Sequence, residues 1–139
     1  MAARNRPLIE WDDALTLGDE TIDRQHKRLV ELINQMDDNR DAPDREMQVM
    51  RCITCMYLHA KEHFWDEEAF MARVGYPDRD RHAELHRQFV RRTHELTDCC
   101  LTDDAPYIEL LDFLVAWFKD HVATEDLRLV AFAKGRDAC

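Results

Sequence analysis

The chain has 139 residues, with 29 acidic and 19 basic side chains and a formal net charge of −10 when histidine is counted as neutral. This length suits one domain, and a 45% hydrophobic fraction with only three glycines favours a packed, mainly helical protein over a disordered one. The acidic balance argues against a nucleic-acid partner, because surfaces that bind nucleic acids need clusters of Lys and Arg.

Nothing in the sequence marks export or membrane insertion. Residues 1–10 contain no apolar run of the length that a signal peptide needs, and the longest apolar run, residues 113–118, is far shorter than the roughly twenty residues that span a bilayer. We therefore expect a soluble, cytoplasmic protein. In that compartment the five cysteines are expected to be reduced, small buried side chains, with redox or metal use of the Cys52-x-x-Cys55 pair as the alternative; the others are Cys99, Cys100 and Cys139.

Glycine, proline and aspartate residues divide the chain into an arm and four long segments. Residues 1–18 are expected to form an N-terminal arm that lies across the rest of the protein as an ordered loop. The segments that follow are poor in internal Gly and Pro, and Asp residues that can cap a helix stand where they begin. They predict helices over residues 19–41, 44–74, 78–102 and 106–134.

Short connections between helices of similar length make neighbouring helices antiparallel. The predicted fold class is therefore all-α. We expect a single domain, residues 19–139, that forms an up-down-up-down antiparallel four-helix bundle.

Each predicted helix carries polar side chains at positions that its apolar spacing places in the core. His26 stands in an apolar stripe with a 4-3-4-3 spacing in the first helix, and His63 and Glu67 take consecutive core positions in the second. The other two helices repeat this arrangement. The full set is His26, His63, Glu67, His82, His86, His121 and Asp126.

A single buried histidine is usually bonded to a nearby carbonyl group, but seven converging polar side chains would leave many atoms unpaired, at a few kcal/mol each. Bound metal ions remove that cost, and bundle cores are known locations of dinuclear sites. Two six-coordinate ions bound by five imidazoles, two bridging carboxylates and one bridging oxygen keep one position vacant, which suits a small diatomic ligand. A nitrogen and oxygen donor set without thiolate favours iron over manganese or zinc.

The spacing from His121 to Asp126 is five residues, which on a regular α-helix turns Asp126 about 140° away from His121. A single turn of π-helix between Val122 and Glu125 would bring both side chains to one face. We therefore predict a π-bulge at this point of the fourth helix.

These residues resemble the pattern of the hemerythrins, specifically the bacterial single-domain form. The resemblance covers residues 11–132, and all seven metal-ligand positions are filled in order. It rests on the motifs Ile22-Asp23-x-Gln25-His26, His63-Phe64-x-x-Glu67-Glu68-x-x-Met71, Tyr76-Pro77, His82-x-x-x-His86-x-x-Phe89 and Trp117-Phe118-x-x-His121-Val122-x-x-x-Asp126.

The resemblance implies a non-haem di-iron centre, with two iron ions per chain and a bridging oxo or hydroxo group, that binds O₂ reversibly. By analogy His82, His86 and His121 would bind one iron, His26 and His63 would bind the other, more open iron, and Glu67 and Asp126 would bridge them. The implied role is that of an oxygen carrier, store or scavenger rather than an enzyme. Its ligands would be O₂, azide and other small anions, and the chain is expected to be a monomer.

The family's oxygen pocket is apolar, and Phe64, Trp117 and Phe118 are our candidates for it, with ordinary core packing as the alternative. His59 departs from the pattern, because an aromatic residue is more usual four residues before His63. We count it as a fourth pocket candidate, the alternative being a half-exposed histidine near the bundle end. Glu68 is expected to face solvent or to hold a ligand imidazole in place.

Two other functions use the same residues and stay open: a sensor of O₂ or redox state, and a di-iron peroxidase or oxidase. The absence of an appended signalling domain in this sequence favours the carrier over the sensor. The motif His59-x-x-Glu62-His63 also matches the inverted zinc peptidases, but that interpretation leaves most of the core histidines without a purpose. Ferritin-like oxidases carry Glu-x-x-His, and no glutamate here is followed by histidine three residues later.

Overall fold

The computed structural model describes the backbone over residues 7–100 and 104–137 and the side chains over residues 7–98 and 104–135. Within these ranges every regular element is helical. The elements are a short 3-10 helix η1 (Asp13–Leu15), α1 (Glu20–Asp38), α2 (Arg45–Val74), α3 (Arg79–Cys100), α4 (Asp104–Asp120), the π-helical η2 (His121–Asp126) and α5 (Leu127–Asp137).

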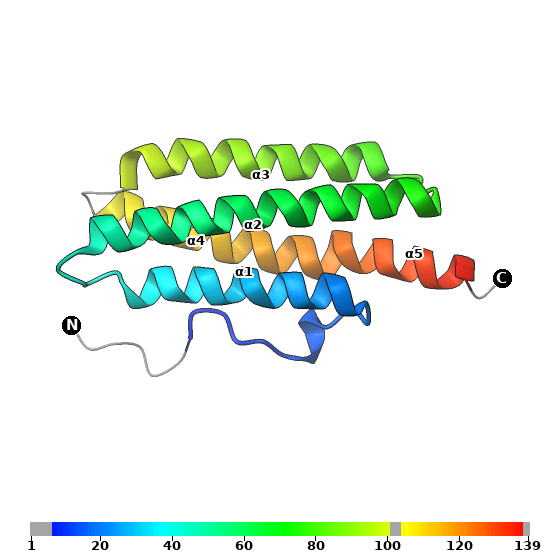
Figure 1. The fold of residues 1–139 in the computed structure, drawn as a ribbon, viewed down its shortest axis with the longest axis horizontal. Helices are drawn as coiled ribbons and strands as arrows, with labels where there is room; N and C mark the ends of the chain where they lie inside the picture. Colours follow the sequence, from blue (N-terminus) through cyan, green and yellow to red (C-terminus); the bar gives the residue numbers. More distant parts are fainter. Residues whose placement is uncertain (1–6, 101–103, 138–139) are drawn as a thin grey trace.

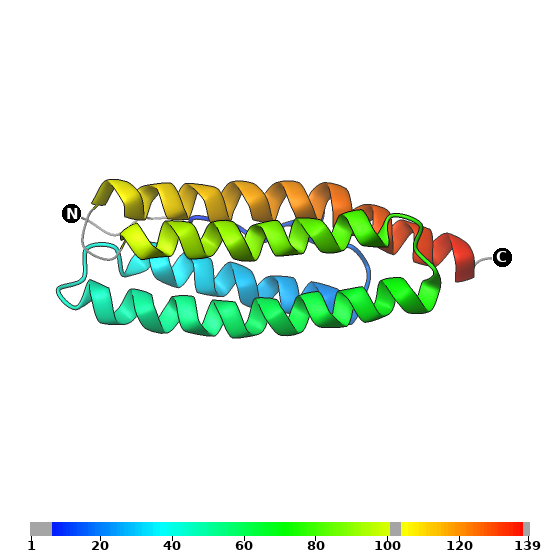
Figure 2. The same ribbon diagram turned by 90° about the horizontal axis from the view of Figure 1, so that it is seen from above.

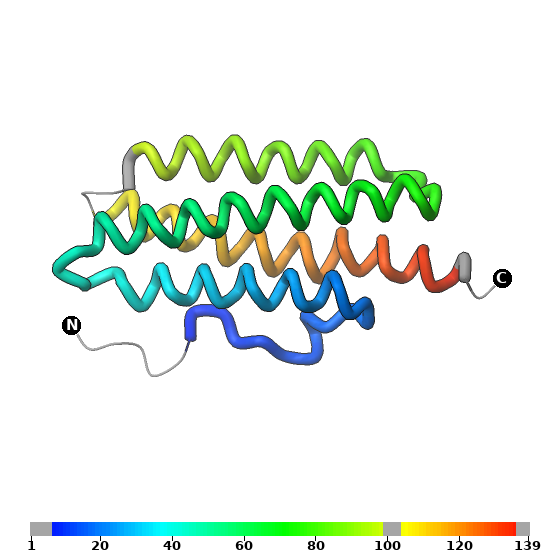
Figure 3. The backbone as a smooth tube through the Cα atoms, in the orientation of Figure 1, coloured from blue at the N-terminus to red at the C-terminus, as the bar shows by residue number. Residues whose placement is uncertain are grey.

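The helices form a bundle of four rods, since α4, η2 and α5 run on as one (Figure 1). Successive rods run in opposite directions, as the views in Figures 2 and 3 show. The all-α, up-down-up-down four-helix bundle is thus confirmed. The predicted helix boundaries differ from the observed ones by a few residues, which is the usual uncertainty at helix ends.

The ends of the rods follow local chemistry. The side chain of Asp19 accepts a hydrogen bond from the backbone N–H of Ile22 and so caps the start of α1. At the end of α2, Gly75 takes φ = 69°, a left-handed conformation that favours glycine. Pro106 lies in the first turn of α4. At that position the missing N–H costs no helical hydrogen bond.

The described part of the N-terminal arm is an ordered loop packed on the bundle. Ile9 is buried, and its backbone N–H and C=O both bond the side-chain amide of Asn34 on α1, at 2.8 and 2.9 Å. Further along, the N–H groups of Leu17 and Gly18 donate to Asp23. These bonds satisfy the arm's backbone and hold the arm against α1.

The core consists of a polar layer between two apolar ones. The larger apolar cluster draws side chains from every rod and includes Met36, Met56 and Leu114. A smaller cluster of Met71, Tyr76 and Leu129 is built from the end of α2, the following turn and α5. The buried histidines, Glu67 and Asp126 belong to neither cluster, so apolar side chains enclose them along the bundle axis.

The described cysteines divide between inside and outside. Cys52 is a buried free thiol, and burial raises its pKa, which suppresses the reactive thiolate. The expectation of a buried side chain is wrong for Cys55, which is exposed because it is one residue, or about 100° of helix rotation, from the buried Met56. The thiols of Cys99, Cys100 and Cys139 lie outside the described side chains.

Across the described helices, none combines the length and the apolar character that crossing a membrane requires.

Candidate metal centre

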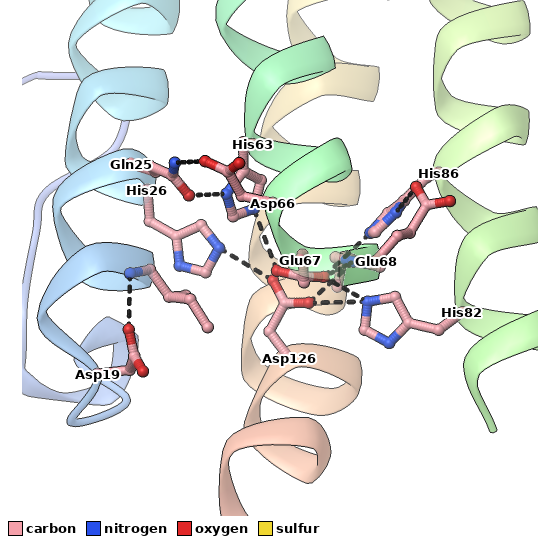
Figure 4. Close-up of polar contacts among 12 residues, drawn as sticks. Asp19, Gln25, His26, His63, Asp66, Glu67, Glu68, His82, His86 and Asp126 are labelled. Carbon is pink, nitrogen blue, oxygen red and sulfur yellow. Dashed lines mark hydrogen bonds and ion pairs between the residues drawn. The ribbon is translucent and has the colours of Figure 1, made fainter. Parts of the chain in front are cut away.

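The seven polar core residues meet at one level of the bundle. None is more than 3% exposed, and all four rods contribute. Figure 4 shows several of these side chains pointing toward a common region between the helices. Their potential donor atoms form two groups within which all atoms lie no more than 4.8 Å apart: Glu67, His82, His86, His121 and Asp126; and His26, His63, Glu67 and Asp126.

The two carboxylates belong to both groups and divide their oxygens between them. Oε1 of Glu67 lies 2.6 Å from Nε2 of His82 and 3.1 Å from Nε2 of His86. Oε2 of the same side chain lies 3.2 Å from Nε2 of His63. Glu67 therefore presents one carboxylate oxygen to the three-histidine group and the other to the two-histidine group.

Asp126 repeats this arrangement from the other side. Its Oδ1 lies 3.0 Å from Nε2 of His82 and 3.1 Å from Nε2 of His121, while its Oδ2 lies 3.0 Å from Nε2 of His26. Two carboxylates that each present one oxygen to either group have the geometry expected of bridging ligands between two metal ions.

A π-helical turn allows both His121 and Asp126 to face the centre of the bundle. Residues His121–Asp126 are π-helical, which confirms the predicted bulge. The wider turn brings side chains five residues apart to the same face, so His121 and Asp126 both point inward and are both buried. A regular α-helix would have turned Asp126 away from the centre.

Several buried atoms of the cluster have no hydrogen-bond partner among the residues that the structure describes. They include His26 Nε2, His121 Nε2, Glu67 Oε2 and both carboxylate oxygens of Asp126. Some of these atoms lie 3.0–3.1 Å from one another but lack the angles that a hydrogen bond needs. Orphaned buried atoms are costly, and a shared cation would satisfy them together. The residues present therefore fit a metal centre with nitrogen and oxygen ligands.

The charges of the cluster are tightly interdependent. Burial lowers the pKa of His82, but the carboxylates of Asp126 and Glu67 outweigh burial and raise that pKa to about 9. Burial also disfavours charge on His63, yet Glu67 raises the pKa of His63 above its ordinary 6.5. Burial raises the pKa of Asp126, but the surrounding imidazoles, His121 first, hold it well below its ordinary 3.8. Metal binding at this cluster must therefore displace protons.

Polar contacts behind the histidines orient their rings. Nδ1 of His63 lies 2.7 Å from Oε1 of Gln25, whose amide N–H₂ donates to Asp66 at 2.8 Å, so the imidazole is the donor to Gln25. Nδ1 of His86 lies 3.1 Å from Oε2 of Glu68, in agreement with one of the two roles expected for that residue. Both contacts turn Nε2 of the ring toward the centre (Figure 4).

Comparison with known proteins agrees with this geometry. A model of the Hemerythrin HHE cation binding domain matches residues 17–133. The chain belongs to the hemerythrin family. It is 29% identical over 124 residues to Bacteriohemerythrin of Clostridium acetobutylicum, covering 86% of this chain and 96% of that protein.

Other hemerythrin relatives match over a similar span. The chain is 30% identical over 118 residues to Bacteriohemerythrin of Pseudomonas aeruginosa strain LESB58, covering 85% of this chain and 76% of that protein. It is 27% identical over 120 residues to Hemerythrin-like protein of Naegleria gruberi, covering 86% and 89% respectively. The resemblance seen in the sequence motifs is thus confirmed.

The aromatic pocket candidates contact both groups of the cluster. Phe64 stacks on His86, with ring centroids 4.0 Å apart and an interplanar angle of 9°. Trp117 stacks on His121 at 4.2 Å and 11°. Both rings therefore cover the three-histidine group. Phe118 meets the two-histidine group, edge-on to His26 at 5.8 Å, and Phe64 also lies 5.7 Å from the ring of His63 in that group.

His59 is not brought into the cluster. It is half-buried, and its Nε2 lies 3.1 Å from the backbone carbonyl oxygen of Gln25. The ring thus ties α2 to α1 one turn away from His63. His94, which belongs to none of the family motifs, is exposed and packs against Tyr57.

Gln25 and Asp66 are the contributors that sequence reasoning missed. Gln25 was visible only as a motif letter beside His26, and Asp66 only as the residue before Glu67. Their roles depend on how α1 and α2 are rotated against each other, and helical periodicity within one helix carries no such information. A polar residue next to each core ligand was the available signal.

Proposed function

We propose that the chain binds O₂ reversibly at a non-haem di-iron centre and serves as an oxygen carrier, store or scavenger. The observation that carries the proposal is the pair of buried carboxylates, Glu67 and Asp126, that each divide their oxygens between a three-histidine and a two-histidine group. Relatives named Bacteriohemerythrin support the same function.

In this proposal His82, His86 and His121 hold one iron ion, and His26 and His63 hold the other. Glu67 and Asp126 bridge the two. When bound, the iron pair supplies two reducing equivalents and one vacant coordination position for O₂. With both carboxylates shared, the ion held by two imidazoles would have fewer protein ligands than the ion held by three, and O₂ would bind on that side.

The protein's own contribution is to orient the ligands and to exclude water. Gln25 and Glu68 hold the rings of His63 and His86, so that Nε2 of each is presented before a metal arrives. The donor atoms are buried between two apolar clusters, and limiting the access of water in this way would slow the side reactions that turn reversible binding into oxidation. Phe118, beside His26, and Phe64, beside His63, are the aromatic side chains that would shape the pocket on the two-histidine side.

Cycling the ferrous protein between O₂ and vacuum tests this function. The protein is loaded with Fe(II) without air, exposed to O₂ and then evacuated, and the optical spectrum is recorded at each step. A carrier regenerates the starting spectrum over several cycles without added reductant. Continuous O₂ consumption with a reductant would instead identify an oxidase or peroxidase, and would contradict the proposal.

A further inference from the structure

A pocket on the outer side of the three-histidine group is not used by the proposed function. It has a volume of about 430 Å³ and lies between α2 and α3. This volume falls within the range of small-molecule sites in proteins, about 300–1,000 Å³. Apolar atoms of Phe64, Trp65 and Val90 contribute to its wall.

Trp65 is the most unusual member of this wall. Its side chain is 76% exposed, the highest value among the large hydrophobic side chains that the structure describes as exposed. An exposed indole beside an apolar concave surface is typical of a binding site rather than of a solvated helix face. Its flat ring offers a stacking surface to a planar aromatic molecule.

The polar side chains of the pocket wall give it an excess of positive charge. Lys61, Arg87 and Arg91 line it against a single carboxylate, Glu68, although the chain as a whole carries a net charge of −10. The two arginines share Glu84, at 2.8 and 3.6 Å, in exposed ion pairs of the kind that contribute little to stability. No ion pair holds Lys61 within the described ranges. An anionic ligand would therefore meet Lys61 unpaired and would compete with Glu84 for the two arginines.

The inner wall of the pocket is also the wall of the candidate metal centre. His86 lines the pocket, Phe64 stacks on the His86 ring at 4.0 Å, and Glu68 contacts its Nδ1 at 3.1 Å. A molecule seated here would lie one imidazole ring away from the cluster.

We propose that this pocket binds a planar aromatic anion, with the ring system on Trp65 and the anionic group at Lys61, Arg87 and Arg91. The stacking surface accounts for the aromatic part, and the three cations on an otherwise acidic protein account for the charge. The proposal concerns a second site and stands whether or not O₂ binding is reversible.

Tryptophan fluorescence provides the test, with flavin mononucleotide as the probe and riboflavin, which lacks the phosphate, as its matched control. Emission in the metal-free and the iron-loaded protein is titrated with each compound and with inorganic phosphate alone. We expect saturable quenching by flavin mononucleotide, a roughly tenfold weaker affinity for riboflavin, and no quenching by phosphate. Added salt should weaken the binding of flavin mononucleotide but not that of riboflavin.

Variants separate the two parts of the site. Because Trp65→Ala removes the indole beside the pocket and leaves the emission of Trp11 and Trp117, binding to the variants is measured by calorimetry. Trp65→Ala should weaken binding of both flavins about tenfold, as expected for a lost stacking contact. Arg87→Gln with Arg91→Gln should weaken only flavin mononucleotide. Leu58→Ala, on the exposed face of α2, and Arg92→Gln, on α3, lie outside the pocket and should change neither affinity.

Three binding results would overturn the proposal. They are no saturable binding of flavin mononucleotide up to millimolar concentration, equal affinity for the two flavins, and wild-type affinity in the pocket variants. A change of tryptophan emission with protein concentration alone, seen in the wild type and absent in Trp65→Ala, would assign this face to a second copy of the chain instead, and would also overturn the proposal.

Discussion

Gln25 on α1 accepts a 2.7 Å hydrogen bond from Nδ1 of His63 on α2. The bond joins two rods of the bundle through a candidate metal ligand, and it selects the tautomer in which Nε2 of His63 carries the free lone pair. Asp66 fixes the amide of Gln25 in turn. The ring orientation of a candidate ligand is thus set by residues that do not belong to the donor set.

Replacing Gln25 tests this orientation. Gln25→Ala should weaken metal retention by about 10- to 100-fold, the usual effect of losing a contact behind a ligand, with the helical content unchanged. Retention is measured by competition with a chelator. Gln48→Ala, which removes only an exposed bond to Asp44, is the control. Equal retention in the Gln25 variant and the wild type would show that the bond does not support the metal.

Replacing a histidine of the three-histidine group should remove the dinuclear centre. His121→Ala takes away one donor and leaves Asp126 without an imidazole that stabilises its charge, so both iron content and thermal stability should fall. Iron per chain and Tm are measured together. The control is His94→Ala, which removes an exposed histidine and should leave both values unchanged. Full iron content in His121→Ala would contradict its assignment as a ligand.

Deleting and inserting one residue in the π-helical turn should have opposite effects on iron binding. Deleting Ala123 leaves His121 and Asp126 four residues apart, a spacing that a regular α-helix keeps on one face, so the deleted protein should still fold and bind iron. Inserting one alanine after Thr124 rotates Asp126 and all of α5 by about 100°. The inserted protein should lose iron and much of its stability, because the buried Leu129 also turns outward.

Iron analysis and thermal unfolding of these two length variants check this prediction. A deletion that loses iron while the insertion keeps it would mean that the π-helical geometry does not serve to place Asp126.

Removal of metal should make stability depend on pH in a defined direction. The pKa of His82 is about 9 in the folded protein, against an ordinary value of 6.5, so the folded state binds the proton more tightly than the unfolded state. The stabilisation is complete below pH 6.5 and is lost as the pH rises toward 9. The raised pKa of His63 acts in the same direction. We therefore expect the free energy of unfolding of the metal-free protein to decrease across this range.

Urea unfolding between pH 6 and 10 measures that dependence. His82→Gln should flatten the curve, because the substitution removes the proton-binding group while keeping a polar side chain. A metal-free protein whose stability stays constant or rises from pH 6.5 to 9 would contradict the charges assigned to the cluster.

The bundle and the positions of the seven polar core residues could be predicted because they depend on periodicity within single helices. His26 and His63 occupy apolar slots in their own helices, and the five-residue spacing before Asp126 conflicts with α-helical rotation unless the helix widens. Both features can be recognised without knowledge of how the helices pack.

Features that depend on the rotation of one helix against another could not be predicted in this way. The pairing of Gln25 with His63 joins α1 to α2, and the stacking of Phe64 on His86 joins α2 to α3. The same limit applies to His59, a pocket candidate from its position in the sequence, whose ring lies against the backbone of α1. A pocket role for His59 stays a prediction without support from these contacts.

Mössbauer spectroscopy of the protein loaded with ⁵⁷Fe and exposed to air tests most directly whether the seven donors hold two irons joined by shared carboxylates. The account predicts two irons per chain and a diamagnetic ground state, because bridged ferric ions couple to each other. A folded protein with a single iron per chain and a magnetically isolated ferric spectrum would contradict it.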